Sequence, residues 1–264
     1  MHTFLYSGAY DDGMFFIGID LAWSKKNASG IAIIKGTKTK GKLIHTSVQH
    51  SLDSMIEVIG RHSGFKDAII AVDAPLTVPN EEGCREAERS LRKVFHKYNA
   101  GAHPSNRTRL GSWNDMIPRG EELVRILEKH GFREDPYIER YEPAKKIIEV
   151  FPHPSQVTLF NLKKILPYKA KPKRDYAFRH EVFKTYQKHL NDLEHKRPSL
   201  TFPDPALLDV DVTLLKGKAL KEYEDLLDGI FCAYLAHYIW ANPEKCKIFG
   251  TVEGGHIITP IPKI

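Results

Sequence analysis

The chain has 264 residues, enough to bury one large hydrophobic core without help from disulfides or metals. Its 39 Lys and Arg against 33 Asp and Glu give a net charge of +6, which favours polyanionic partners, although a solvated basic surface explains the excess equally well. No apolar run approaches the length of a membrane span, so we expect no contact with a membrane. The composition therefore favours a globular domain over a membrane protein.

The cysteines and the N-terminus bear on location. Cys84, Cys232 and Cys246 form no CxxC pair, and the first residues lack the basic and apolar regions of a signal peptide. We therefore expect a cytoplasmic protein. Residues 1–13 carry little core pattern and are interpreted as an N-terminal tail, with Met14 as a possible natural start; residues 14–264 are expected to form a single domain.

The domain is expected to begin with three strands and a helix. Residues 15–21 (FFIGIDL) and 31–34 are apolar runs on either side of a polar turn, and residues 42–48 partly alternate, which predicts a third strand. Residues 51–61 then carry apolar side chains at helical spacing. The sequence therefore predicts a meander of three strands followed by a helix.

A buried parallel strand and an insertion follow. Residues 67–72 (DAIIAV) form a β-branched run without alternation, which is typical of a strand covered on both faces, and Pro75 ends it just after Asp73. The next such run is residues 146–151 (KIIEVF). The interval exceeds what a crossover helix needs, so we expect an insertion at about residues 79–145.

Most of the remaining chain is expected to be helical. Helices are predicted at about residues 82–98 and 120–130 within the insertion, and at about 155–165, 176–193 and 220–240 after it; the last has the strongest apolar stripe. The basic stretch 168–174 and a loop at 196–205 lie between them. Residues 248–252 and 256–261, separated by Glu253-Gly254-Gly255, predict a C-terminal β-hairpin.

Four acidic residues interrupt or end apolar elements: Asp20, Asp73, Glu149 and Asp228. A buried carboxylate costs several kcal/mol unless it is paired or bound to a metal. If the strands that end in Asp20 and Asp73 are neighbours, their carboxylates share one site. Asp228 falls on the core side of the last helix, and Asp225 lies near the same face.

Oxygen ligands of this kind suit Mg²⁺ or Mn²⁺, and two such ions can activate a water and stabilise the leaving oxygen in phosphodiester hydrolysis. The alternative stays open for each residue alone. Asp20 and Asp73 would then make Asx turns or cap the next segment, and Asp228 would pair with a Lys or His.

Four segments carry a family resemblance: GIDLAW (18–23), AVDAP (71–75), EVFP (149–152) and DLLD (225–228). They resemble a widespread family of unknown function described as predicted nucleases with a ribonuclease H-like fold, distantly similar to RuvC-type Holliday-junction resolvases. The resemblance implies an α/β fold with a mixed five-stranded central sheet, its first three strands antiparallel, flanked by helices.

The resemblance also implies that Asp20, Asp73 and Asp228 are metal ligands. Glu149 matches the family's Glu before an aromatic-Pro pair, but the ribonuclease H pattern has no firm counterpart on that strand. No acidic residue on the helix at 51–61, such as Glu57, supplies the ribonuclease H-type ligand, so the RuvC-like arrangement fits better. The fold alone does not fix the function.

Basic residues supply candidate phosphate contacts. The candidates are Arg85 and Arg89 in the insertion, and Lys169, Lys171, Lys173 and Arg174 in the basic stretch. Solvated charge explains the first group equally well, because acidic residues are interspersed there. His153 is a further candidate, as a general base or substrate contact.

The predicted function is a nuclease dependent on Mg²⁺ or Mn²⁺, with two ions, acting on DNA or RNA. Asp20, Asp73, Glu149 and Asp228 are the predicted catalytic residues, with Asp225 as an additional ligand. One alternative is a non-catalytic nucleic-acid-binding module with a vestigial site. Another is an actin-like or sugar-kinase phosphotransferase, which would require glycine-rich phosphate turns that the sequence lacks.

Overall fold

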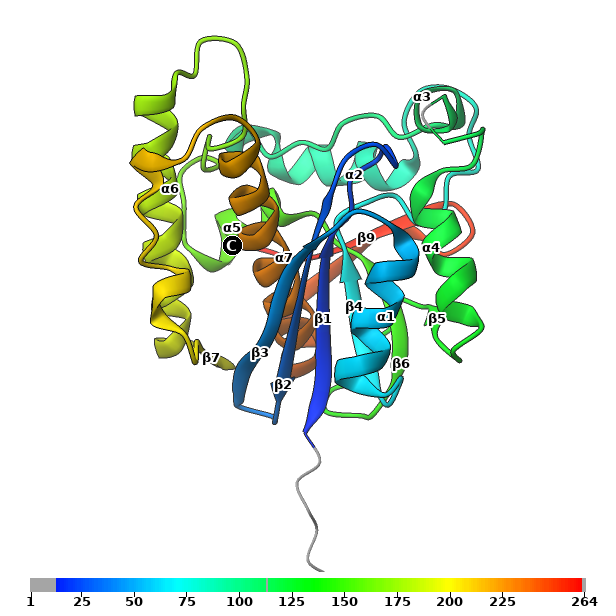
Figure 1. Ribbon diagram of the computed structural model, residues 1–264. Helices are drawn as coiled ribbons and strands as arrows, with labels where there is room; N and C mark the ends of the chain where they lie inside the picture. Colours follow the sequence, from blue (N-terminus) through cyan, green and yellow to red (C-terminus); the bar gives the residue numbers. More distant parts are fainter. Residues whose placement is uncertain (1–12, 113, 263–264) are drawn as a thin grey trace, which may run out of the picture.

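The first three strands form an antiparallel meander, as their apolar runs predict. The computed structural model describes residues 13–112 and 114–262, so the expected tail lies almost wholly outside the described residues. β1 (Met14–Asp20) pairs with β2 (Ser29–Gly36), and β2 pairs with β3 (Lys40–Gln49). β1 is the central strand of the sheet (Figure 1).

The other half of the sheet is parallel to β1. β4 (Ala68–Val72) pairs with β1, and β6 (Lys145–Glu149) pairs with β4, both in parallel. Every residue of β4 is buried, which explains why this strand shows no alternation. The predicted inner parallel strand is therefore confirmed.

The sheet in the described residues has seven strands, in the order β5-β6-β4-β1-β2-β3-β7, so the expected number of five is wrong. The additional strands are β5 (Arg133–Glu134) and β7 (Ser199–Thr201), which pair in parallel with β6 and β3 at the two edges. Segments of two or three residues are too short to show an alternation. β7 also lies inside the interval 196–205 that was expected to be a loop.

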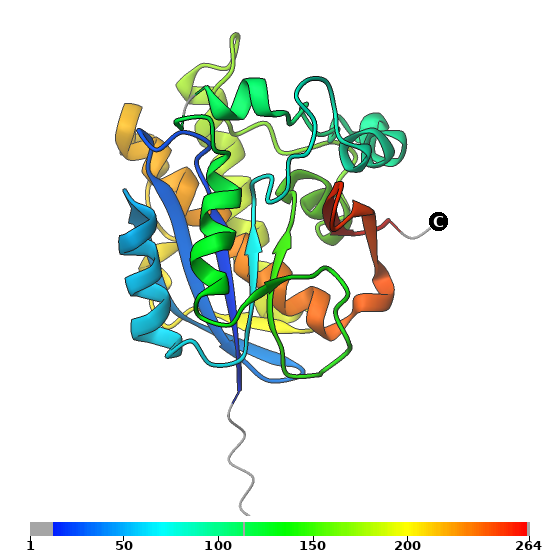
Figure 2. The ribbon, with the colours of Figure 1, turned by 90° about the vertical axis from the view of Figure 1, so that its right-hand side faces the viewer.

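Helices cover both faces of this mixed sheet, as Figures 1 and 2 show. α1 (Leu52–Ser63) and α4 (Arg119–Glu128) cover one face, where they pack in a common core with alternate residues of β1 such as Ile17. α7 (Gly217–Ala241) covers the other face and packs against Phe16. Each strand thus divides its side chains between two cores.

Two further helices complete the α7 side. α5 (Pro152–Leu159) starts at the end of β6, three residues earlier than expected, and α6 (Tyr176–Asn191) packs its Phe183 and Tyr186 into the same core as α7. Short 3-10 helices lie at His96–Tyr98, Asp192–His195, Pro205–Leu207, Val212–Leu214 and Pro243–Lys245. The predicted helices are confirmed with shifted ends.

Two glycines allow α7 to lie directly on the sheet. A Cβ added at Gly18 of β1 would lie 1.9 Å from the backbone nitrogen of Ala233, and one at Gly30 of β2 would lie 1.8 Å from the carbonyl oxygen of Asp225. Any larger residue would push the helix away. The close approach brings the acidic side of α7 next to the end of β1.

The segment between β4 and β6 passes over the carboxyl ends of β1 and β4. It contains α2 (Glu86–Phe95), α3 (Arg107–Gly111), α4 and β5. α2 packs against the C-terminal hairpin, β8 (Cys246–Thr251) and β9 (Gly255–Pro260), which confirms the predicted hairpin. None of the described helices has the length and apolar character needed to cross a bilayer.

Candidate functional site

Asp20 and Asp73 lie side by side at the carboxyl ends of neighbouring strands. Asp20 is the last residue of β1, and Asp73 directly follows β4. The parallel register pairs Ile19 with Val72, and the Asp73 backbone N–H donates to the Ile19 carbonyl at 2.8 Å. The two strands are sheet neighbours, which is the condition under which the sequence places both carboxylates at one site.

Asp225 and Asp228 reach the same place from α7. Asp20 pairs in the sheet with Gly30, over which the backbone of Asp225 lies in close contact. Asp228 is fully buried and Asp225 nearly so. Beside the effect of burial, the charge of Asp228 raises the pKa values of Asp20 and Asp73, and the charge of Asp20 raises the pKa of Asp225. We call Asp20, Asp73, Asp225 and Asp228 the aspartate cluster.

Asp228 is the best-paired member of the cluster. Its Oδ1 accepts hydrogen bonds from the hydroxyls of Tyr168 at 2.7 Å and Tyr186 at 3.1 Å, and its Oδ2 lies 3.0 Å from Nζ of Lys169. Burial opposes ionisation, but the charge of Lys169 and the Tyr168 hydroxyl outweigh it and lower the pKa of Asp228. Asp228 is therefore an anion at neutral pH.

Lys169 lies inside the cluster. Its Nζ is 4.0 Å from Oδ2 of Asp73 as well as 3.0 Å from Asp228. Burial disfavours its charge, but Asp228, Asp20 and Asp73 raise the pKa of Lys169 well above its usual value. Lys169 thus balances carboxylates, which is the alternative considered for Asp228, and its side chain remains 31% exposed.

The pKa values of Asp20 and Asp225 are both raised. Burial, then the charge of Asp20, raise the pKa of Asp225 to about 8. Burial also raises the pKa of Asp20. Lys221, one turn earlier on α7, lies 2.5 Å from Oδ1 of Asp225 and 2.9 Å from Glu224.

Positive charge is scarce at Asp73. Burial raises its pKa well above the usual value, and the neighbouring Asp20 and Asp228 raise it further, while Lys169 acts in the opposite direction. Four aspartates thus share the ammonium groups of Lys169 and Lys221. A multivalent cation would balance the remaining carboxylates better than these two ammonium groups do.

The donor chemistry of the cluster fits a divalent ion, because all four donors are carboxylate oxygens, which Mg²⁺ and Mn²⁺ prefer. In the arrangement of residues 13–112 and 114–262, however, no three His, Cys, Asp or Glu side chains are grouped as one ion would require. Lys169 lies between two of the candidate ligands instead. Metal binding therefore requires the lysine side chain to withdraw.

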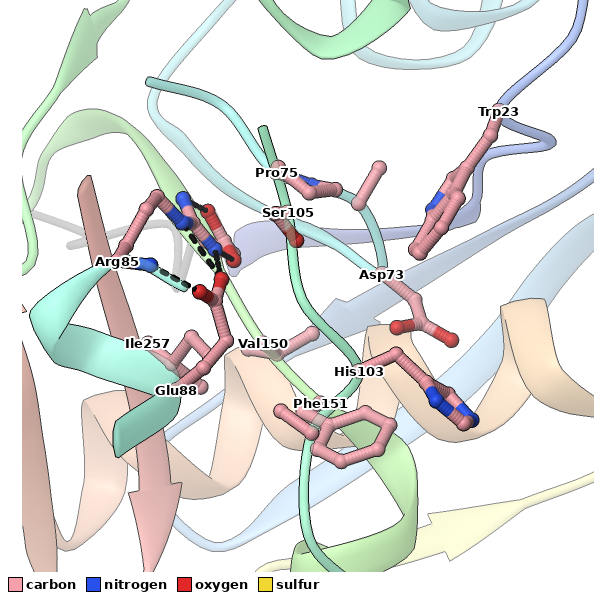
Figure 3. A pocket seen from close by; sticks show the side chains of 13 residues that line it. Trp23, Asp73, Pro75, Arg85, Glu88, His103, Ser105, Val150, Phe151 and Ile257 are labelled. Carbon is pink, nitrogen blue, oxygen red and sulfur yellow. Dashed lines mark hydrogen bonds and ion pairs between the residues drawn. The ribbon is translucent and has the colours of Figure 1, made fainter. Parts of the chain in front are cut away.

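A cavity of about 290 Å³ opens the cluster to solvent. Asp20, Asp73 and Lys169 line it, together with Trp23, His103, Phe151, His153, Lys171 and Arg174. Figure 3 shows the Asp73 carboxylate between Trp23 on one side and His103 and Phe151 on the other. Burial lowers the pKa of His153 to about 3, so this residue is neutral at physiological pH.

Glu149 belongs to a different, closed network. Its Oε2 accepts from the Leu76 backbone N–H at 2.9 Å and from Arg85 at 2.8 Å, and its Oε1 accepts from Arg85 at 2.5 Å. Arg85 also bonds Glu88 at 2.6 Å (Figure 3). Burial raises the pKa of Glu149, although Arg85 acts against this shift. We call these three charged residues the Glu149 network.

The Glu149 network changes two of the expectations. Arg85 is only 3% exposed and is held by two carboxylates, so it is not a surface contact for phosphate. Glu149 has its oxygens occupied by Arg85 and Leu76 rather than directed at the aspartate cluster. Both residues therefore hold the insertion to the end of β6 in this arrangement.

The remaining basic candidates differ in whether they line the cavity beside Asp20 and Asp73. Lys171 and Arg174 line the cavity with Asp20 and Asp73, and Arg174 also donates to the Lys169 carbonyl at 3.0 Å. Lys173 is exposed in the same segment but does not line the cavity. Arg89 is exposed and paired with Glu86 at 3.0 Å.

Sequence reasoning missed several residues at the site. Tyr168 and Tyr186 have no distinguishing pattern among the eleven tyrosines. Lys221 does have one, since it precedes Asp225 by four residues on a helix and such pairs interact. Trp23 follows Asp20 by three residues and had been considered only as part of the family resemblance.

Comparison with known proteins gives one match. The model of a family described as "Protein of unknown function (DUF429)" matches residues 18–253, which include the aspartate cluster, Lys169 and Glu149. No curated protein and no solved structure matches the chain. The match covers most of the chain but assigns no activity.

Proposed function

The chain belongs to this family of unknown function, DUF429, and we propose that it is a divalent-metal-dependent nuclease that hydrolyses phosphodiester bonds at the aspartate cluster. The observation that carries the proposal is the convergence of Asp20, Asp73 and Asp228 from three separate elements beside a solvent-accessible cavity. Buried like charges are costly, and sites that need them are the usual reason to retain them.

Asp20, Asp73 and Asp228 would hold the ions, two in number, with Asp225 as a further ligand. A bound divalent ion supplies Lewis-acid polarisation of a phosphoryl oxygen and lowers the pKa of water. The chain's own groups supply the rest. Tyr168 and Tyr186 fix the orientation of Asp228, and the ammonium of Lys169, once displaced from Asp73, is placed to hydrogen-bond an anionic phosphate oxygen.

The order and direction of the strands support the proposal that the fold is ribonuclease H-like. An antiparallel β1-β2-β3 meander with β4 and β6 added in parallel is compatible with the ribonuclease H-like arrangement that the sequence resemblance implies. The helix that carries acidic residues lies across β1 and β2, next to the end of β1. We propose this fold class on topology and residue order alone.

One observation favours a second candidate, a nucleic-acid-binding module with a vestigial site. Lys169 already neutralises part of the cluster, as a fixed cation would in a protein that no longer binds metal. The two candidates differ in whether metal binds and in whether cleavage occurs.

The test is cleavage of a panel of labelled DNA and RNA substrates, single-stranded, duplex and branched, with Mn²⁺ and with chelator. We expect cleavage in Mn²⁺ and none in chelator. Asp20→Asn and Asp228→Asn should each lower the cleavage rate by at least about 100-fold, because even residues that only support metal ligands contribute 10- to 100-fold. Asp67→Asn is the matched control, since Asp67 is exposed at the opposite end of β4.

Full activity in either ligand variant, with the Asp67 control unchanged, would contradict the assignment of the site. No cleavage of any substrate by the wild-type protein, together with metal-independent binding, would favour the vestigial module. Thermal melts of each variant establish that it is folded before activity is compared.

A further inference from the structure

Two cavities beside the aspartate cluster have three lining residues in common, and we call the two cavities together the groove. The cavity of about 290 Å³ that contains Asp73 and a second of about 860 Å³ that contains Asp225 are both lined by Asp20, Ala22 and Trp23. A still smaller pocket on the Asp73 side is also lined by Trp23. Trp23 therefore lines both the cavity that contains Asp73 and the cavity that contains Asp225.

The charges along this groove follow a simple pattern. Lys171 and Arg174 line the cavity that contains Asp73, and Lys26 and Lys218 line the other, where Lys218 is 3.5 Å from Glu222. A polyanion with regularly spaced charges would meet cations in both cavities.

The position of Trp23 is fixed by the insertion. The Asn114 side-chain amide donates to the Trp23 carbonyl at 2.5 Å, and buried Arg119 donates to the carbonyls of Ala22 at 2.9 Å and Ser24 at 3.2 Å. The guanidinium of Arg109 lies 5.2 Å from the centroid of the Trp23 ring. The aromatic group and a neighbouring cation are thus held in place before any ligand arrives.

We infer that the groove binds single-stranded nucleic acid, with a base next to the scissile phosphate stacked against Trp23. This inference rests on the proposed nuclease function. Aromatic rings are useful to a nucleic-acid enzyme when bases are unstacked, and Phe151 and Trp23 line the cavity on both sides of Asp73. The recessed carboxylates, with Asp228 fully buried and Asp73 17% exposed, are accessible to a flexible strand and not to a rigid duplex.

The experiment measures binding without cleavage. Labelled 12-nucleotide single strands of DNA and of RNA, and duplexes of the same sequences, are titrated with the full chain in chelator, with fluorescence anisotropy as readout. We expect single strands to bind at least about tenfold more tightly than duplexes. Trp23→Ala should weaken this binding by about tenfold or more, and Trp23→Phe by less, because base stacking contributes 1–3 kcal/mol per base.

Tyr137→Ala is the matched control, because Tyr137 is 62% exposed and lies away from the groove, in the segment between β5 and β6. A second pair of variants remains informative if Trp23→Ala fails to fold. Replacing Lys26 and Lys218 by Gln should reduce the slope of log Kd against log salt by about 1.4, because each phosphate contact to a single strand contributes about 0.7. Replacing Lys171 and Arg174 by Gln should reduce the slope by the same amount.

Equal binding of duplex and single strand, or a Trp23→Ala variant that is folded and binds as tightly as wild type, would overturn the inference. Binding of single strands through Trp23 without any cleavage in Mn²⁺ would contradict the nuclease proposal and leave this inference standing. Efficient cleavage of duplexes through the aspartate cluster would support the nuclease proposal and contradict this inference. Differences between the DNA and RNA arms identify which polymer the groove prefers.

Discussion

The molecule buries carboxylates in two places, and the two places differ in how the charge is balanced. In the Glu149 network, both oxygens of Glu149 accept hydrogen bonds from Arg85, and Glu88 binds the same guanidinium. In the aspartate cluster, Nζ of Lys169 is 4.0 Å from Asp73, and burial, then the charge of Asp20, raise the pKa of Asp225 to about 8. In one region both carboxylates are hydrogen-bonded to the buried guanidinium, and in the other Asp73 has its cation only at 4.0 Å.

This difference separates structural from functional carboxylates. An internally paired group such as Glu149 contributes to stability in the protein as it stands, because removal of one partner leaves the other buried and unpaired. A group such as Asp73 reduces the stability of the folded chain in the absence of a ligand. Sequence patterns alone treat both as acidic residues at strand ends.

The largest expected effect is on the Glu149 network. Glu149→Gln should lower the free energy of unfolding by about 3 kcal/mol, because the amide replaces one of the two oxygens that accept from buried Arg85 by a donor and leaves a guanidinium N–H without its acceptor. Glu86→Gln, on the same helix as Glu88 but in an exposed pair with Arg89, should change stability by less than about 0.5 kcal/mol. Urea denaturation of both variants measures the difference. Equal effects would remove the distinction between the two regions.

The next effect concerns Lys169. Lys169→Met should lower stability in chelator at pH 8 by about 1–2 kcal/mol, less than a fully buried pair because the side chain is 31% exposed. Mn²⁺ should then stabilise this variant more than wild type, because the ion no longer competes with the ammonium. Lys163→Met, exposed in the same segment, is the control. A variant that is destabilised and gains nothing from Mn²⁺ would identify Lys169 as a purely structural partner.

The smallest effect has the opposite sign. Asp73→Asn should raise stability in chelator by about 1 kcal/mol, because a carboxyl whose pKa is raised on folding weakens the folded state once the pH exceeds its unfolded value of 3.8. In a chain of this size the shift in Tm is about 2–4 °C. Calorimetry against the Asp67→Asn control measures it. A lower Tm would assign Asp73 to a turn or an ion pair.

Sequence patterns predicted the parts of the site that lie on regular elements. Asp20 and Asp73 each follow a β-branched run, and Asp228 falls on the core side of the long helix, so their elements and their convergence could be deduced. The short edge strands β5 and β7 could not, because two or three residues show no period.

The partners of the carboxylates were not predictable from local pattern. Arg85 and Glu149 are 64 residues apart, and Lys169 and Asp228 come from a basic stretch and a helix that pack only in the folded chain. Lys169 was grouped with its basic neighbours in sequence, whereas tertiary packing separates it from Lys173. Charge patterns report composition along the chain, and pairing depends on which elements meet.

The central claim, that the aspartate cluster is a cation site, is tested most directly by thermal melts of wild type, Asp73→Asn and Glu149→Gln across a Mn²⁺ titration from chelator. Wild type should gain about 2.7 kcal/mol when Mn²⁺ reaches 100 times its Kd. Glu149→Gln should be less stable than wild type in chelator and gain as much stability from Mn²⁺. Asp73→Asn should be more stable than wild type in chelator and gain much less. A wild type indifferent to Mn²⁺, beside an Asp73→Asn variant less stable in chelator, would contradict the account.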